Sequence, residues 1–235
     1  MKLLAIVAHP DDAAIFCGGT LAKHAERGDH VTVAHMTRGE YGGLGSDTEE
    51  DVATVRTEES RAAGDVLGVD EVEFLGFKDG RVEYSLENRL ALVDTLRKYD
   101  PDVVLTHFKD DMHPDHQATA RLVTDAYYMA SLPLVETDFE PCDPDNIYFF
   151  GKPTSSFEAE TFVDISGYLD TKIGALEQHV SQIDFLIDHG GIDAEFDNLV
   201  DSLRAEGMTL GKRVGCEAAE GFAPLHEQAR DFLMD

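Results

Sequence analysis

Residues 3–12 are LLAIVAHPDD, an apolar run that stops at a histidine, a proline and two aspartates. Six apolar or small residues in succession are typical of a short strand that is buried on both faces of a parallel sheet. An amphipathic stretch over residues 12–27 follows and is closed by a glycine, which favours a helix. We therefore predict a strand, a turn and a helix in succession, with His9, Asp11 and Asp12 at the turn.

Short apolar runs and longer amphipathic stretches alternate through the first two thirds of the chain, as is typical of βαβ units. A chain of 235 residues fits one such domain. We predict a single α/β, Rossmann-like domain over residues 1–235, with a mostly parallel twisted sheet and helices on both faces. We expect strands at residues 3–8, 31–36, 71–75, 102–106, 147–150 and 161–165, and helices at residues 12–27, 49–67, 86–99, 114–130, 168–188, 194–204 and 225–233.

A second polar cluster, DMHPDH at residues 111–116, follows the fourth predicted strand. In doubly wound sheets with strand order 3-2-1-4-5, the first and fourth strands flank the switch point, and ligands bind beyond their carboxyl ends. We therefore expect the two clusters to face one pocket. An aspartate before a helix is usually an N-cap, but capping alone explains poorly why both clusters pair histidine with aspartate around a proline.

The residue types of the two clusters suit a catalytic metal ion. Such a site uses three protein ligands and keeps one position open for water. His9 and Asp12 lie three positions apart across the turn, and His113 and His116 stand in the same relation at a helix start. Three ligands taken from these clusters leave a carboxylate and a histidine over, which suit the proton transfers of amide hydrolysis.

The charge balance excludes several partners. The chain has 47 Asp plus Glu against 19 Lys plus Arg, which gives a formal net charge of −28. Nucleic acids and anionic membrane surfaces need basic clusters, so we expect neither as a partner. The acidity favours adaptation to high salt, because at about 1 M the Debye length is only about 3 Å and carboxylate repulsion is screened. An acidic protein from a low-salt source is the alternative that composition leaves open.

The three cysteines, Cys17, Cys142 and Cys216, are far apart and form no CxxC pair. We interpret them as small buried hydrophobes, with neither a disulfide framework nor a thiolate metal site. The apolar run at residues 3–8 is too short for a signal peptide, and no run approaches the ~20 residues that span a membrane. We expect a cytoplasmic protein that is not inserted in a membrane.

The sequence resembles a known family at several places. The paired motifs at residues 8–12 and 113–116 look like the signature of the PIG-L/LmbE-like de-N-acetylases. Further matches in family order lie at residues 18–22, 37–40, 67–69, 74–77 and 79–80, at Arg56 with Glu59, at His179 with Ser181-Gln182, and at residues 220–222. The resemblance covers about residues 3–185. It implies a zinc-dependent hydrolase that removes acetyl from an N-acetylglucosamine-type substrate.

Carried over residue by residue, the resemblance assigns a role to each member of the two clusters. It implies that His9, Asp12 and His116 bind Zn²⁺ or another divalent metal, and that Asp11 is the general base. His113 then stabilises or protonates the tetrahedral intermediate, with Asp115 orienting it. The further polar residues expected on the ligand face are Arg38, Glu40, Arg56, Asp79, Asp111 and His179.

The sequence departs from the family pattern at two places. Ala13 and Ala14 stand where many relatives have a glutamate, which changes a contact around the metal without removing a ligand. Asp111 stands where some members use a tyrosine to help the oxyanion, so His113 carries more of that task.

Several alternatives stay open at this stage. One is an amidase that cleaves a larger N-acyl or thiol-conjugate amide, and another is a metal-binding module without turnover. A nucleotide-binding Rossmann protein is disfavoured, because the glycines of residues 17–20 lie inside the predicted helix and no GxGxxG motif follows the first strand. The identity of the acetylated substrate and the oligomeric state, which includes a homo-oligomer, are open.

Overall fold

The computed structural model describes residues 1–43, 47–152, 156–183 and 199–227. Its seven-stranded sheet has the order β3-β2-β1-β4-β5-β7-β6. The first five of these strands are parallel, and β7 runs antiparallel to both β5 and β6. The strands are β1 Lys2–Val7, β2 His30–Thr37, β3 Glu71–Phe77, β4 Val103–His107, β5 Asn146–Phe150, β6 Thr161–Asp164 and β7 Ala219–Pro224.

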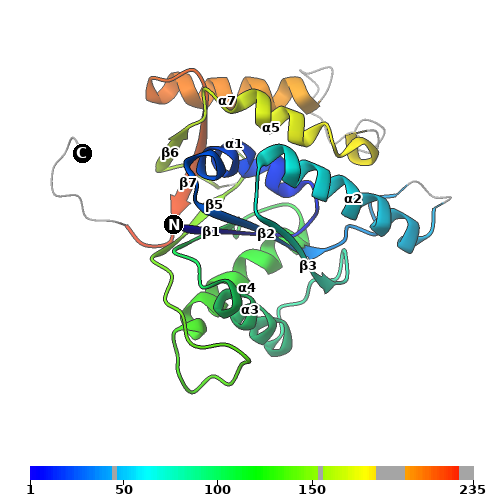
Figure 1. Ribbon diagram of the computed structural model, residues 1–235, viewed down its shortest axis with the longest axis vertical. Coiled ribbons are helices and arrows are strands. Elements are labelled where there is room, and N and C mark those ends of the chain that lie inside the picture. The colour runs from blue at the N-terminus through cyan, green and yellow to red at the C-terminus, as the bar shows by residue number, and fades with distance from the viewer. Residues whose placement is uncertain (44–46, 153–155, 184–198, 228–235) are drawn as a thin grey trace.

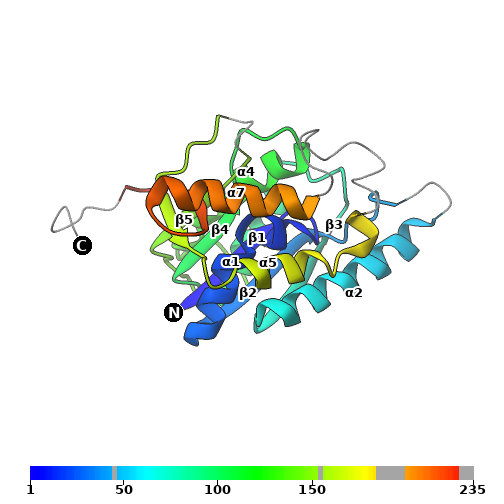
Figure 2. The ribbon, with the colours of Figure 1, turned by 90° about the horizontal axis from the view of Figure 1, so that it is seen from above.

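Helices cover both faces of the sheet, as the alternating pattern predicts. Figure 1 shows α1, α2, α5 and α7 on one face and α3 and α4 on the other, and Figure 2 shows the first face from above. The helices are α1 Asp12–Arg27, α2 Glu49–Leu67, α3 Leu86–Tyr99, α4 Pro114–Ala130, α5 Leu169–Leu176 and α7 Leu199–Val214. The single mostly parallel α/β domain predicted from the sequence is therefore confirmed.

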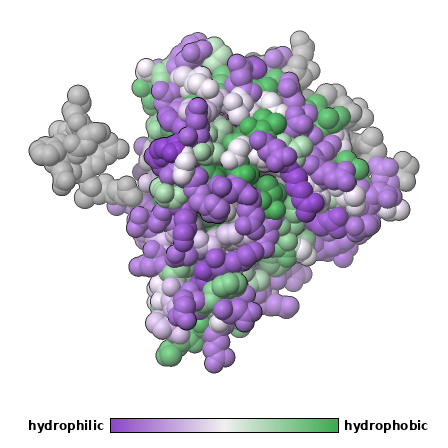
Figure 3. Space-filling model, viewed as in Figure 1, coloured by the Kyte–Doolittle hydropathy of each residue, from purple (hydrophilic) through white to green (hydrophobic). Residues whose placement is uncertain are grey.

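The hydrophobic core lies in two layers that β1 separates. Leu3, Ala5 and Val7 pack into the layer beneath α1 and α5, whereas Leu4 and Ile6 pack into the layer beneath α3 and α4. Successive side chains of a strand point to opposite faces, so an apolar residue at every position is what a central strand with two covered faces requires. The outer surface is mostly hydrophilic on the face seen in Figure 3, in keeping with the charge of −28.

The glycines at residues 18–19 serve helix packing. They lie in the middle of α1, where a Cβ on Gly19 would stand 2.7 Å from Ile165 Cδ1. The amides of Gly19 and Thr20 donate to the Glu220 carboxylate at 3.0 and 2.7 Å, and the Lys172 ammonium lies 2.6 Å from the same carboxylate. No helix begins at these glycines, so the feature that gave the nucleotide-binding alternative has a structural explanation.

The predictions fail mainly in the last third of the chain. The helix predicted at 168–188 is interrupted, because α5 ends at Leu176 and helical residues resume only at 180–183; the rest of that prediction lies outside the described residues. Helix α7 runs ten residues past the predicted end at Arg204, to Val214, and β7 was not predicted. Residues 225–227 are not helical, and most of the helix predicted there lies outside the described part. Among the described residues, every helix is too short or too polar to cross a membrane.

Candidate active site

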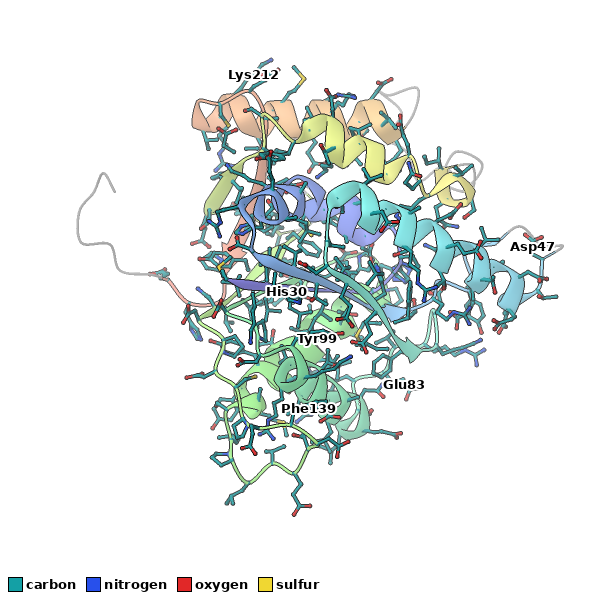
Figure 4. The ribbon with its side chains drawn as sticks, viewed as in Figure 1. His30, Asp47, Glu83, Tyr99, Phe139 and Lys212 are labelled. Carbon is teal, nitrogen blue, oxygen red and sulfur yellow. The ribbon has the colours of Figure 1, made fainter. Side chains whose placement is uncertain are left out.

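The two polar clusters meet at the carboxyl ends of β1 and β4, which are adjacent parallel strands. His9 and Asp12 follow β1, whereas His113 is the N-cap of α4 and His116 lies in its first turn. The loops beyond β2 and β3 lie at the same edge of the sheet. Figure 4 labels His30 at the amino end of β2, and Asp47 and Glu83 on those two loops.

The donor atoms of three side chains, His9, Asp12 and His116, lie close to one another. His9 Nδ1 lies 3.2 Å from His116 Nε2 and 3.3 Å from Asp12 Oδ2, and His116 Nε2 lies 3.3 Å from Asp12 Oδ1. Ligands about 2.0–2.1 Å from a tetrahedral zinc ion are separated by about 3.3 Å, so the spacing fits such an ion. Three overlapping sets of donors among the described residues could hold a cation: His9 with His113 and His116, Asp12 with His107 and His116, and His9 with Asp79 and Asp115.

Carboxylates surround the two histidine rings. His9 Nε2 lies 3.3 Å from Asp79 Oδ1 and 3.4 Å from Asp115 Oδ2, and His116 Nδ1 lies 3.2 Å from Asp111 Oδ2. Such contacts orient ligand rings and raise their basicity. We expected Asp115 to orient His113 and Asp111 to face the substrate. Their carboxylates lie against His9 and His116 instead, because the turn at residues 111–116 directs both toward the rings.

The electrostatics of the cluster favour a positive charge. Burial opposes protonation of both rings, but the facing carboxylates outweigh it, raising the pKa of His9 well above its usual range and that of His116 to about 9. Burial also opposes ionisation of Asp12, yet His116, His107 and His9 lower its pKa well below the usual value. Metal binding requires neutral imidazoles and releases these protons, and a divalent cation would then supply the positive charge that the carboxylates favour.

Asp11 is held by a buried arginine. Arg56, which is 4% exposed, donates from Nη2 to Asp11 Oδ1 at 2.7 Å and from Nη1 to the Gly39 carbonyl at 2.8 Å. Within the described part of the chain nothing donates to Asp11 Oδ2. One carboxylate oxygen is therefore fixed while the other can accept a proton, which is what a general base requires.

His113 presents a proton donor toward solvent. Its Nδ1 accepts the Asp115 backbone N–H at 3.2 Å, so in the neutral ring the proton sits on Nε2. Burial and the neighbouring His9 and His116 lower the pKa of His113, which keeps the ring neutral. Its ring centroid lies 4.5 Å from that of His9, and one of its ring nitrogens lies within 4.8 Å of donor atoms of His9 and His116.

The other predicted site residues lie at three different places. Glu40 and Asp79 lie together beside the cluster, since Glu40 Oε1 accepts the Asp79 N–H at 3.2 Å and Asp79 touches His9. Arg38 is paired with Glu50 at the surface. His179 has no exposed surface and lines a small pocket with Pro10 and His35. Burial lowers the pKa of His179, and Asp11 and Arg56 are close enough to influence it, so this histidine lies behind the turn that carries Asp11.

Sequence reasoning missed two histidines at the carboxyl ends of neighbouring strands. His107, at the end of β4, accepts the Ala8 N–H at Nε2 and stacks on His116 with centroids 3.9 Å apart. His35, near the end of β2, contacts the backbone of His9. Burial lowers the pKa of both to about 4. A single histidine in an apolar strand gives no signal of its own, but its place one strand away from a polar cluster could have identified it.

Comparison with known proteins gives consistent matches. The profile of the family described as PIG-L, GlcNAc-PI de-N-acetylase, matches residues 4–127. A diacetylchitobiose deacetylase of Thermococcus kodakarensis is 33% identical over 77% of this chain and 70% of its own length. The structure of an N,N'-diacetylchitobiose deacetylase from Pyrococcus horikoshii superimposes with a TM-score of 0.83 at 28% identity, over 95% of this chain and 83% of that one. A 4-oxalmesaconate hydratase of Pseudomonas putida is 30% identical over 74% of this chain and 71% of its own length.

Proposed function

The chain belongs to the PIG-L family of GlcNAc-PI de-N-acetylases, and on that premise we propose that it hydrolyses the acetamide of an N-acetylglucosamine-type substrate and releases acetate. The observation that carries the proposal is the convergence of His9 Nδ1, Asp12 and His116 Nε2 at spacings of 3.2–3.3 Å, with an anchored carboxylate, Asp11, next to them in the chain. The relatives named as deacetylases of acetylated sugars support the substrate class.

We assign the metal ligands to His9, Asp12 and His116. Four carboxylates (Asp12, Asp79, Asp111 and Asp115) contact the rings of His9 and His116, and Asp11, next to Asp12 in the chain, is paired with Arg56. Buried carboxylates in this number need positive charge for compensation. Two imidazoles and a carboxylate with an open position form the donor set of catalytic zinc sites. His107 is a less suitable ligand, because its Nε2 lone pair already accepts the Ala8 N–H.

The chain's own residues supply the proton transfers. When bound, a divalent metal polarises the acetamide carbonyl and makes a water molecule more acidic. Asp11 Oδ2 accepts the proton of the attacking water, while Arg56 holds Oδ1 and so fixes the direction of the base. His113 Nε2–H donates to the carbonyl oxygen as charge develops on it. The proton taken up by Asp11 is then available to the leaving amine, which departs as the C–N bond breaks.

The polar residues around the cluster define the remaining contacts. Glu40 lies beside the cluster and Arg38 stands further out at the surface, so we propose that these two residues face the sugar hydroxyls, whereas Asp79, whose Oδ1 lies against His9, acts on that ring. We propose that Arg56 and Asp111 act on Asp11 and His116 rather than on the substrate. The cytoplasmic location and the oligomeric state stay predictions.

An acetate-release screen tests the proposed function. Purified, zinc-loaded protein is incubated with N-acetylglucosamine, diacetylchitobiose and N-acetylglucosamine conjugates of inositol and malate, and released acetate is measured by a coupled assay. We expect zinc-dependent release from at least one of them. The hydratase relative defines the opposing outcome. A zinc-loaded protein that releases no acetate from any acetylated sugar and no acid from a larger N-acyl amide, yet hydrates an unsaturated acid, would overturn the proposal.

A further inference from the structure

Just after β1, each backbone N–H and carbonyl of Ala8 and His9 forms a hydrogen bond with a side chain. The N–H of Ala8 donates to His107 Nε2 at 3.0 Å, and its carbonyl accepts the Thr37 hydroxyl at 2.9 Å. The N–H of His9 donates to Asp12 Oδ2 at 2.7 Å, and its carbonyl accepts from His35 Nδ1 at 3.0 Å. A buried turn of two residues with four such bonds has little freedom to move.

His35 is the member of this set that acts on a metal ligand and on nothing else at the site. Its side chain is 1% exposed and lines a small pocket with the apolar groups of Val33, Ala63 and Val72 and with the ring of His179. An imidazole in apolar surroundings is unfavourable unless both nitrogens are satisfied. Here both are, because Ser60 Oγ lies 2.8 Å from Nε2 while Nδ1 faces the His9 carbonyl.

These two contacts fix the position of the ring proton. A carbonyl only accepts, so Nδ1 must carry the hydrogen that is donated to His9. Nε2 is then an acceptor, and the Ser60 hydroxyl must donate to it. The chain of hydrogen bonds therefore runs in one direction, from Ser60 on α2 through His35 on β2 to the carbonyl of His9, and no other tautomer satisfies both ends.

We propose that His35, held in one tautomer by Ser60, is a positioning residue that fixes the His9 backbone and thereby sets the geometry of the metal site. The inference rests on the proposed role of His9 as a ligand. Partners that orient a ligand typically change metal affinity about 10–100-fold when they are removed, and an anchor on the ligand's own carbonyl acts in the same way. Both residues are buried, with exposed fractions of 1% for His35 and 3% for Ser60.

The test compares two substitutions of His35 with a control on the same strand. His35→Leu removes the donor and keeps an apolar volume, whereas His35→Asn places an amide N–H where Nδ1 stands. Val33→Ala is the matched control, since Val33 lies two residues earlier on β2, lines the same pocket and makes no bond to His9. Zinc affinity is measured by chelator competition, the cobalt-substituted proteins are compared by visible absorption, and the Tm of each metal-free protein is recorded.

We expect His35→Leu to weaken zinc about 10–100-fold and to shift the cobalt bands, while His35→Asn stays within about threefold of the wild type. Val33→Ala should lower the Tm and leave affinity and spectrum unchanged. Should His35→Leu not fold, Ser60→Ala replaces it, with the same shift in the cobalt bands and a weakening of a few fold. A His35→Leu or Ser60→Ala protein with wild-type affinity and spectrum would overturn the inference about His35 and leave the ligand assignment intact. A wild-type protein that binds neither metal would overturn the ligand assignment as well.

Discussion

Removing the Lys172 ammonium should destabilise the fold far more than removing an exposed lysine. Its Nζ lies 2.6 Å from Glu220 Oε1, and the side chains are 7% and 4% exposed. In Lys172→Met the carboxylate keeps the two α1 amides but loses its only ion-pair partner among the described residues. Leaving one charge of a buried pair uncompensated costs about 3–5 kcal/mol. For a domain of this size that corresponds to a fall in Tm of roughly 6–20 °C.

The assay is thermal unfolding by circular dichroism, with a control of identical chemistry. Lys98 lies 2.7 Å from Glu73, but those side chains are 37% and 27% exposed, so Lys98→Met should cost less than about 1 kcal/mol. Adding Glu220→Gln to Lys172→Met removes the unpaired buried carboxylate and should recover part of the lost Tm. Equal Tm values for Lys172→Met and Lys98→Met would refute the reasoning, because they would mean that the buried carboxylate needs no ion-pair partner.

Three further predictions address the site, the cysteines and the charge. Asp111→Asn should weaken zinc binding about 10–100-fold, because Asp111 Oδ2 lies 3.2 Å from His116 Nδ1; an unchanged dissociation constant in chelator competition would contradict this role. At about pH 8 iodoacetamide should label Cys216 alone in the native protein. Cys17 and Cys142 are buried, and burial raises the pKa of both thiols, that of Cys142 to about 11. Mass spectrometry that finds label on Cys17 or Cys142 before unfolding would contradict this prediction. The Tm should rise from low salt to about 2 M KCl, because salt screens carboxylate repulsion, and a flat or falling Tm would remove the interpretation of the acidity as adaptation to salt.

Most of the fold could be predicted from the sequence where periodicity and stop signals agree. Helix α1 begins and ends at the predicted residues, with Gly28 in the left-handed conformation at its end. Strand β7 could not be found in this way, because its sequence, AEGFAP, has low strand propensity and is ordered by pairing with β5 and β6. Helix α7 continues to Val214, past the predicted end at Arg204, and includes Gly207 and Gly211. Gly211 permits close packing, since a Cβ there would stand 2.6 Å from the Ala218 amide.

The candidate site could likewise be predicted only in part from the sequence. Its clusters at residues 9–12 and 111–116 could be placed together because strand order alone determines that β1 and β4 are neighbours. What each carboxylate touches could not be predicted, since Asp115 reaches His9 through a turn whose shape depends on its bonds to Gly80 and Val82. The role of His35 depends on a contact between β2 and the turn after β1, which no spacing in the sequence reveals.

The comparison of Asp11→Asn with Asp12→Asn tests the central claim most directly. Acetate release is measured for both proteins, from the substrate that the screen identifies, while zinc is added stepwise. Asp11→Asn should bind zinc as the wild type does and lose about 10²–10⁴ in kcat at every zinc concentration, because the proton acceptor is gone. Asp12→Asn should bind zinc weakly and regain part of its activity as zinc is raised, because a ligand is gone. If added zinc restored the activity of Asp11→Asn but not that of Asp12→Asn, the account would be contradicted, because Asp11 would then be the ligand and Asp12 the base.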